Sequence, residues 1–250
     1  MNQSERDDYR KSSYGDYRTI ERDGVSEVDQ AAGARIFVNR VYNWMFCGLM
    51  LTTIAAFAAT HISKDIFMAV FNIRLPLIIA ELVLVIVLSA GIRKMSAPVA
   101  GVMFIAYSIL NGLTLSPIFL VYTETSICLA FGSCALMFLA TSVFGYMTGM
   151  RLDTVGSYCF MGLIGFLIAS LVNLFLRSEM LDYILSYVGI AIFVGLTAWD
   201  TQKVRMIGEE AGEEAQSDDM RKVAIVFALN LYLDFINLFL MLLRIFGRRR

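Results

Sequence analysis

Long apolar stretches separated by short polar turns dominate the chain. Four of them contain no Asp, Glu, Lys or Arg: residues 41–60, 95–123, 125–150 and 154–176. A helix rises about 1.5 Å per residue, so about 20 apolar residues cross about 30 Å of hydrocarbon. The pattern predicts seven membrane-spanning helices, at roughly 38–60, 75–93, 98–122, 127–150, 156–176, 182–204 and 223–246.

These stretches predict an all-α membrane protein, because hydrocarbon cannot hydrate unpaired backbone groups. The composition agrees, with 58% hydrophobic and 17% charged residues. It excludes an ordinary soluble enzyme, a nucleic-acid-binding protein and a disordered scaffold. Residues 1–34 are polar and predict a disordered tail, residues 35–247 form the membrane domain, and residues 248–250 form a short basic tail.

The distribution of Lys and Arg predicts the orientation, since these residues favour cytoplasmic loops. For seven spans, nine Lys and Arg residues lie near span ends on the side of the N-terminus, and three lie on the other side. This count leaves out Arg244 and the three arginines at 248–250. We therefore expect a cytoplasmic N-terminus in a plasma membrane. The C-terminal arginines conflict with this placement, so either they lie outside against their charge or one segment fails to cross.

Cysteine and histidine do not suggest a metal site. All four cysteines, at positions 47, 128, 134 and 159, fall in apolar stretches and predict small buried hydrophobic side chains. The single His61 lies in a predicted loop. We expect no disulfide framework, no cofactor and no zinc site.

Ionisable residues inside the spans carry the candidate chemistry, because a charge at the bilayer centre costs at least about 2.5–3.5 kcal/mol. Glu81, Asp200 and Asp234 lie inside spans, and Arg93 closes the second span. We expect Asp200 near the inner face, Asp234 near mid-membrane and Glu81 towards the outer third. The four positions predict a staggered polar track through the bundle.

The last span has a polar face formed by residues at spacings of four, three and seven: Asn230, Asp234, Asn237 and Arg244. We expect this face to turn to the bundle interior. The third span carries Ser108 and Asn111 on one face, and Pro117 could free a backbone carbonyl there. Glu81, Asn111, Asn230 and Asn237 are candidate pore-lining residues, although Asn and Ser also join helices by hydrogen bonds.

Asp200 and Asp234 form the candidate proton-sensing and cation-binding pair. Two carboxylates about 4 Å apart repel by about 4 kcal/mol at an effective dielectric constant near 20, so they would share one proton. Calcium could replace that proton, because it prefers oxygen ligands. Arg93 could pair with Asp200 and close the inner end as a latch. A static ion pair that fixes helix register is the structural alternative.

The same segments resemble the Bax inhibitor-1 family, also called transmembrane Bax inhibitor motif proteins. The resemblance rests on AWDTQ at 198–202, LYLDFINLF at 231–239, residues 81–93 and NGLTLSPI at 111–118. It covers about residues 35–247, and VYNWM at 41–45 resembles the bacterial branch. The match implies a bacterial inner-membrane protein.

The resemblance also implies a fold and an activity. It implies seven helices with the last one central and surrounded by the other six. It implies a pH-sensitive calcium leak, with Asp200 and Asp234 as the proton-sensing pair and Arg93 as the latch. The family relative has a run of basic residues where this chain has only Arg93 and Lys94.

Three other functions remain open at this point. A regulatory protein could act through a membrane-protein partner, such as a membrane protease, without ion flux of its own. A proton-coupled transporter would show broken helices and inverted repeats. An intramembrane aspartyl protease would need a Gly-x-Gly-Asp motif, whereas Asp234 follows Leu-Tyr-Leu, so we do not expect an enzyme.

Overall fold

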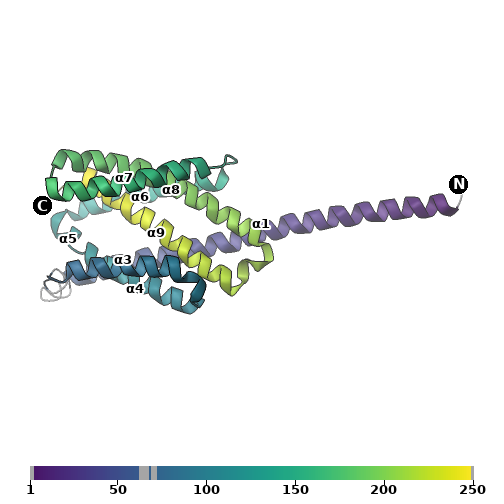
Figure 1. Cartoon of the computed structure of the whole chain (residues 1–250), viewed down its shortest axis with the longest axis horizontal. Coiled ribbons are helices and arrows are strands. Elements are labelled where there is room, and N and C mark those ends of the chain that lie inside the picture. The colour runs from purple at the N-terminus through teal and green to yellow at the C-terminus, as the bar shows by residue number, and fades with distance from the viewer. Residues whose placement is uncertain (1–2, 62–67, 69–71, 249–250) are drawn as a thin grey trace.

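The computed structural model describes residues 3–61, 68 and 72–248, with side chains from residue 28 onward except those of Arg93 and Glu213. Every regular element there is helical (Figure 1). In chain order the elements are α1 (Gln3–His61), α3 (Arg74–Gly91), η1 (Ile92–Lys94), α4 (Ala97–Leu115), α5 (Ile118–Val121), α6 (Glu124–Met147), α7 (Asp153–Leu176), α8 (Glu179–Ala211), η2 (Gly212–Gln216) and α9 (Asp218–Phe246).

Seven helical segments in the described chain are long and apolar enough to span a membrane, which confirms the predicted number. They cover Val28–His61, Arg74–Gly91, Ala97–Val121, Glu124–Met147, Asp153–Leu176, Glu179–Ala211 and Asp218–Phe246. The two ends of the chain lie at opposite ends of the bundle (Figure 1). The odd number of spans therefore separates Arg248 from the N-terminal side.

The third span is broken, and proline is the reason. Proline has no backbone N–H and cannot continue the helical ladder, so α4 ends at Leu115 and the short α5 begins after Pro117. The Ser116 N–H turns back to the carbonyl of Leu113, at 3.2 Å. The Ser116 hydroxyl is buried and has no hydrogen-bond partner among the described residues.

Three spans begin with the residue types that satisfy free backbone N–H groups. At the starts of α6, α8 and α9, the side chains of Thr123, Ser178 and Ser217 each accept a hydrogen bond from the backbone N–H of the residue three positions later. Acidic residues follow in the first turn of each helix, where they stabilise the positive end of the helix dipole. The polar residues between apolar stretches therefore define where the spans begin.

Helix α9 is the most deeply buried of the seven spans, because 56% of the residues in its most apolar part are buried inside the protein. It packs against α1, α4, α6 and α8, whereas α3 packs mainly on α4 and α7 mainly on α8. Figure 1 shows α9 running obliquely between α7 and α8 on one side and α3 and α4 on the other. The arrangement agrees with a buried last helix, while a complete ring of six helices around it stays a prediction.

The N-terminal segment differs from the predicted disordered tail. Helix α1 begins at Gln3 and continues without a break into the first span, so its N-terminal part projects away from the bundle (Figure 1). A helix that is already nucleated in the membrane gains one hydrogen bond for each added residue without a new nucleation cost. The division of the chain at residue 34 stays a prediction.

The connection between α8 and α9 packs on α1. Helix α8 extends to Ala211, about two turns beyond the predicted span. Arg40 on α1 donates a hydrogen bond from Nη1 to the Ala215 carbonyl at 2.8 Å, and Ala215 is fully buried. Gly208 lies against the backbone of Ala34. The acidic segment 205–222 is therefore an ordered helical connection held against the first helix.

Many apolar side chains lie on the outer surface, and the cysteines illustrate why. All four are free, but only Cys134 is fully buried, while Cys47 and Cys128 are exposed. The prediction that all of them are buried was therefore wrong for these two. In a membrane, lipid surrounds the outer faces of the helices, so an apolar side chain does not have to enter the protein core.

Small residues allow the closest helix contacts. At Gly145 on α6, an added Cβ would meet the backbone carbonyl of Ala198 on α8. At Gly112 on α4, it would meet the carbonyl of Thr52 on α1. Close backbone approach is a common basis of helix association in lipid, where the hydrophobic effect between helices is weak.

We expect Gly145→Val to lower the free energy of unfolding by about 1–3 kcal/mol, the usual cost of overpacking. Gly165→Val on α7 is the matched control, because nothing lies within 4 Å of its Cβ position. Unfolding of both variants in mixed micelles, followed by tryptophan fluorescence, tests this. Equal midpoints for the two variants would contradict the assigned α6–α8 contact.

Candidate functional site

A cavity of about 600 Å³ lies between α3, α7, α8 and α9 and reaches α4. Most of its wall is apolar, formed by side chains such as Leu82, Leu163 and Phe193. Five of the residues predicted from the sequence line it: Glu81, Asp200, Asn230, Asp234 and Asn237. Residues far apart in the chain therefore line one cavity between the helices, which is open to the outside where Leu82 and Phe160 are exposed.

Asp234 is the most constrained group in this cavity. Its side chain lies on the buried helix α9, and the residue is only 5% exposed. The Oδ2 atom is buried and has no hydrogen-bond partner among the described residues, while the Thr197 hydroxyl on α8 interacts with the carboxyl group. A buried polar atom without a partner is costly, so Oδ2 requires a proton, a water molecule or a cation.

Asp200 lies on α8 and lines the same cavity, with an exposed fraction of 8%. The two carboxyl groups lie close enough for a negative charge on one to disfavour a negative charge on the other. The two predicted residues are thus neighbours in one apolar environment, which supports the predicted pair. Direct contact between their oxygens stays a prediction.

Lys203 also lines the cavity, although it was not predicted from the sequence as a site residue. It lies one turn beyond Asp200 on α8 and interacts electrostatically with Asp200 and with Asp153. Its Nζ atom lies 3.2 Å from the centre of the Trp199 ring, a cation–π contact. The spacings of three and four between these residues put them on one helix face, a signal that was available in the sequence.

Trp199 fixes this end of the chamber. Its indole N–H donates to Asp153 Oδ1 at 3.4 Å, which joins α8 to the start of α7. An added Cβ at Gly156 would meet the same indole ring. The tryptophan is therefore packed against the first turns of α7, with the lysine ammonium group over its face.

Glu81 enters the cavity from α3, and its carboxyl group has partners. The Thr114 hydroxyl donates to Oε1, and the Asn111 amide donates to Oε2 at 3.5 Å. Asn111 does not line the cavity itself, contrary to the prediction, because its side chain joins Glu81 to the neighbouring helices. Glu81 is thus held by α4, unlike Asp234.

This network continues to α9 and α1 through Tyr232. The Tyr232 hydroxyl donates to Asn111 Oδ1 at 3.2 Å and lies 2.6 Å from the Thr52 hydroxyl. Thr52 lies 2.9 Å from the carbonyl of Ser108. Tyr232 is fully buried and also makes edge-to-face contacts with Phe104 and Tyr107. A chain of hydrogen bonds thus links four helices beside the cavity.

The polar stripe of α9 divides into two parts. Asn230, Asp234 and Asn237 face the cavity, and the Asn237 amide also donates to the Leu233 carbonyl at 2.8 Å. Arg244 lies beyond it, in a smaller pocket of about 160 Å³. There its Nη1 is 3.4 Å from Asp182 Oδ1, which also accepts from the Asn173 amide at 2.7 Å.

Arg93, the predicted latch, lies in the 3-10 turn η1 after α3. Its side chain lies outside the described residues, so its pairing with Asp200 stays a prediction. Lys203 is the basic side chain that the described structure places at the cavity wall.

The ligand set suits a weakly held cation. In the described part of the chain, no three His, Cys, Asp or Glu side chains converge as a metal cluster. Calcium takes six to eight oxygen ligands, and the aspartate pair offers at most four carboxylate oxygens. A cation at Asp200 and Asp234 would therefore keep several water molecules.

Together these features define a class: a helical membrane protein whose most buried helix carries a carboxyl group to a cavity between its helices. Residues 34–250 match the family model described as "Inhibitor of apoptosis-promoting Bax1". The chain belongs to the Bax inhibitor-1 family.

Bacterial relatives match along nearly their whole length. The inner membrane protein YbhL of Escherichia coli (strain K12) is 50% identical over 228 residues, which is 90% of this chain and 97% of the relative. An uncharacterized protein of Borreliella burgdorferi is 40% identical over 86% of this chain and 92% of its own. An uncharacterized membrane protein of Streptococcus pyogenes serotype M1 is 35% identical, with 90% and 98% covered.

The Tyr232 network gives a testable expectation about stability. Tyr232→Phe keeps the ring and its aromatic contacts but leaves the buried Asn111 Oδ1 and the Thr52 hydroxyl without this partner. We expect the free energy of unfolding to fall by about 1–3 kcal/mol. Tyr187→Phe is the control, because that side chain is exposed on α8. Equal thermal midpoints of the two variants in detergent would contradict a structural role for the hydroxyl.

Proposed function

We propose that the protein is a proton-gated cation leak that conducts calcium, with the Asp200 and Asp234 carboxyl groups as its internal ion site. One observation carries the proposal: the unpartnered Asp234 Oδ2 beside a cavity in the membrane domain. In an ion pair with a purely structural role, a hydrogen-bond donor would contact this oxygen. Oδ2 itself is buried beside the cavity, so protons and cations would reach it only when neighbouring side chains move.

The charge in the cavity favours cations. Glu81, Asp200 and Asp234 supply three acids, and Lys203 supplies one base. Low-dielectric walls strengthen the field of such groups and raise the local concentration of counter-ions. Asn230 and Asn237 add amide oxygens near Asp234, which suit a hard ion such as calcium.

Lys203 suggests how protons gate the pathway. When Asp200 is ionised, it attracts the Lys203 ammonium group, which packs on Trp199 at the end of the chamber. This attraction holds a positive charge across the mouth and opposes cation passage. When the pH falls and Asp200 takes a proton, the attraction is lost and the mouth is released, so flux rises towards acid pH. Arg93 would add to the closure from the end of α3.

Orientation follows from the same positions. The α8–α9 connection lies at the end of the bundle from which α1 projects (Figure 1), and Lys203 lies on the part of α8 that leads into this connection. With a cytoplasmic N-terminus, the Lys203 mouth opens to the cytoplasm of a bacterial inner membrane. Calcium would then pass from the outside towards this mouth.

We expect calcium flux into proteoliposomes to increase as the pH is lowered. Asp234→Asn should remove most of the pH dependence of the flux, because the pair loses the carboxyl group that shares a proton with Asp200. Asp200→Asn should give high flux at all pH values, because it mimics the protonated residue. Asp219→Asn is the control, since this acid is exposed at the start of α9. Identical flux in all these proteins would overturn the mechanism.

A second variant tests the gate itself. Lys203→Met keeps the stem of the side chain but removes its charge, so the closed state at high pH should weaken. We expect flux at alkaline pH to rise roughly tenfold, which corresponds to an attraction of about 1.4 kcal/mol. Lys94→Met, at an exposed position in η1, should behave like the parent protein. An alkaline flux in Lys203→Met no higher than in the parent would exclude the lysine gate.

The regulatory alternative predicts a different result. A protein that acts only through a membrane-protein partner would show no pH-dependent flux in pure proteoliposomes. It would co-purify with that partner in stable proportion. The same flux experiment therefore separates the two functions.

A further inference from the structure

A second hollow lies on the other side of α9, in the outer surface of the bundle. Helices α1 and α6 both pack against α8 and α9, and between them run two pockets of about 480 and 360 Å³. The pockets share five lining residues, so they form one continuous groove: Leu49, Met50, Thr53, Phe131 and Phe235. Its combined size is in the range of ligand pockets, about 300–1,000 Å³.

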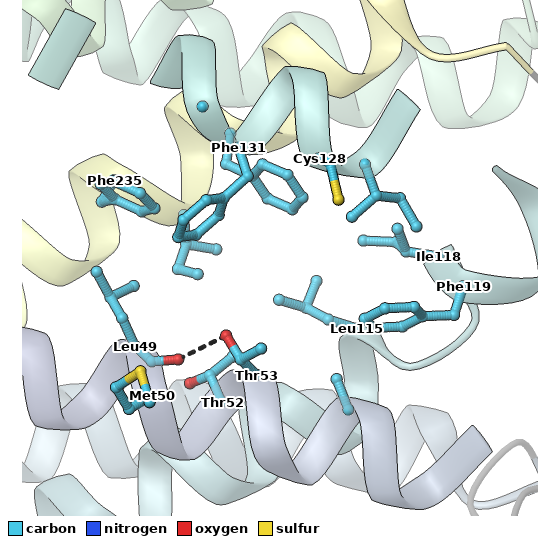
Figure 2. Close-up of a pocket in the computed structure, with 15 residues that line it drawn as sticks. Leu49, Met50, Thr52, Thr53, Leu115, Ile118, Phe119, Cys128, Phe131 and Phe235 are labelled. Atoms are coloured by element: carbon cyan, nitrogen blue, oxygen red, sulfur yellow. Dashed lines mark hydrogen bonds between the residues drawn. The ribbon is translucent and has the colours of Figure 1, made fainter. Parts of the chain in front are cut away.

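The groove is lined almost entirely by hydrocarbon and sulfur (Figure 2). Figure 2 shows the side chains of Met50, Leu115, Phe119 and Cys128 around an open centre. The two threonines at its wall already have partners: Thr53 donates to the Leu49 carbonyl at 2.9 Å, and Thr52 to the Gly48 carbonyl at 2.9 Å. Neither threonine hydroxyl therefore needs a hydrogen bond from a molecule in the groove, which fits an alkyl chain as the occupant.

One end of the groove is tied to the basic C-terminus. The Thr123 N–H donates to the Arg248 carbonyl at 3.2 Å, and the Arg248 N–H donates to the Ser126 hydroxyl at 2.9 Å. The next two residues of α6, Ile127 and Cys128, line the groove. The backbone of Arg248 is thus fixed about one helical turn from the groove, and its side chain is exposed.

The charge at this end is positive. Arg248 is followed in the sequence by two more arginines, and Glu124 is the single acid in the turn that opens α6. Arginine binds phosphate well because its planar group offers several N–H donors. The end of a lipid-facing apolar groove thus carries groups that match a phosphate at the membrane surface.

We propose that this groove binds an anionic glycerophospholipid, with an acyl chain between α1 and α6 and its phosphate against Arg248. The site is separate from the cation cavity, since Phe235, Ile236 and Phe239 face the groove, while Asp234 and Asn237 face the cavity. A bound lipid would also cover the face of α9 that α1 and α6 leave open.

Gly132 on α6 provides the sharpest test. It lines the groove, and nothing lies within 4 Å of a Cβ built on it, so a larger side chain can start from this position towards the groove. Gly132→Leu should fill the space that the acyl chain occupies. Gly165→Leu on α7 is the matched control, because it adds the same side chain in open space away from the groove.

The experiment uses the full-length protein in detergent, titrated with phosphatidylglycerol and observed by native mass spectrometry and thermal unfolding. We expect the parent and Gly165→Leu to retain a bound lipid and to gain thermal stability from it. Gly132→Leu should lose both effects while keeping the parent's stability without lipid. Retention of the lipid and of the stabilisation in Gly132→Leu would overturn the proposal.

The headgroup is tested with a second lipid and a second variant. Phosphatidylcholine should stabilise the parent less than phosphatidylglycerol does. Replacement of the three arginines at 248–250 by Gln should remove that difference. Equal effects of the two lipids on the parent would overturn the anionic assignment. A parent dimer that Gly132→Leu converts to a monomer would assign the groove to a second copy of the chain instead.

Discussion

A carboxyl group buried on the most deeply buried helix is the constraint on which this structure depends. Asp234 lies inside the membrane domain with one oxygen that no described donor reaches. Lipid on the outside could not tolerate such a group, so α9 has to be covered by α1, α4, α6 and α8. The cavity lined by Asp200 and Asp234 lies beside this buried oxygen.

Glu81 and Asp234 differ in their hydrogen-bond partners. Both enter the same cavity, but Thr114 and Asn111 already donate to Glu81. Glu81 therefore joins α3 to α4 and, through Asn111 and Tyr232, to α9 and α1. Asp234 has no such complete set of donors, and for this reason we assign the exchangeable site to it and to Asp200.

The two sides of α9 serve different environments. One side presents Asn230, Asp234 and Asn237 to the cavity, and the other presents Phe235 and Phe239 to the apolar groove. The same helix thus separates the proposed ion site from the proposed lipid site. The C-terminal arginines conflict with the usual charge rule for orientation. An anionic lipid headgroup at the end of the groove would give them a binding partner.

Composition and spacing were sufficient to predict seven helices, their approximate limits and the polar face of the last span. These features follow from helix rise, from the apolar length needed to cross a bilayer and from the 3.6-residue period, all of which are local. The aspartate pair was also visible, because an acid in an apolar stretch stands out without any knowledge of its neighbours.

Which side chains meet was decided by the tertiary structure alone. Asn111 serves Glu81 and Tyr232 rather than the cavity, Lys203 lines the chamber, and α1 extends as a helix through a segment predicted to be a tail. Cys128 faces a groove that exists only because α1 and α6 approach α9 without closing over it. Such contacts depend on how helices distant in the chain are tilted and spaced, and a periodic pattern along one helix carries no information about that.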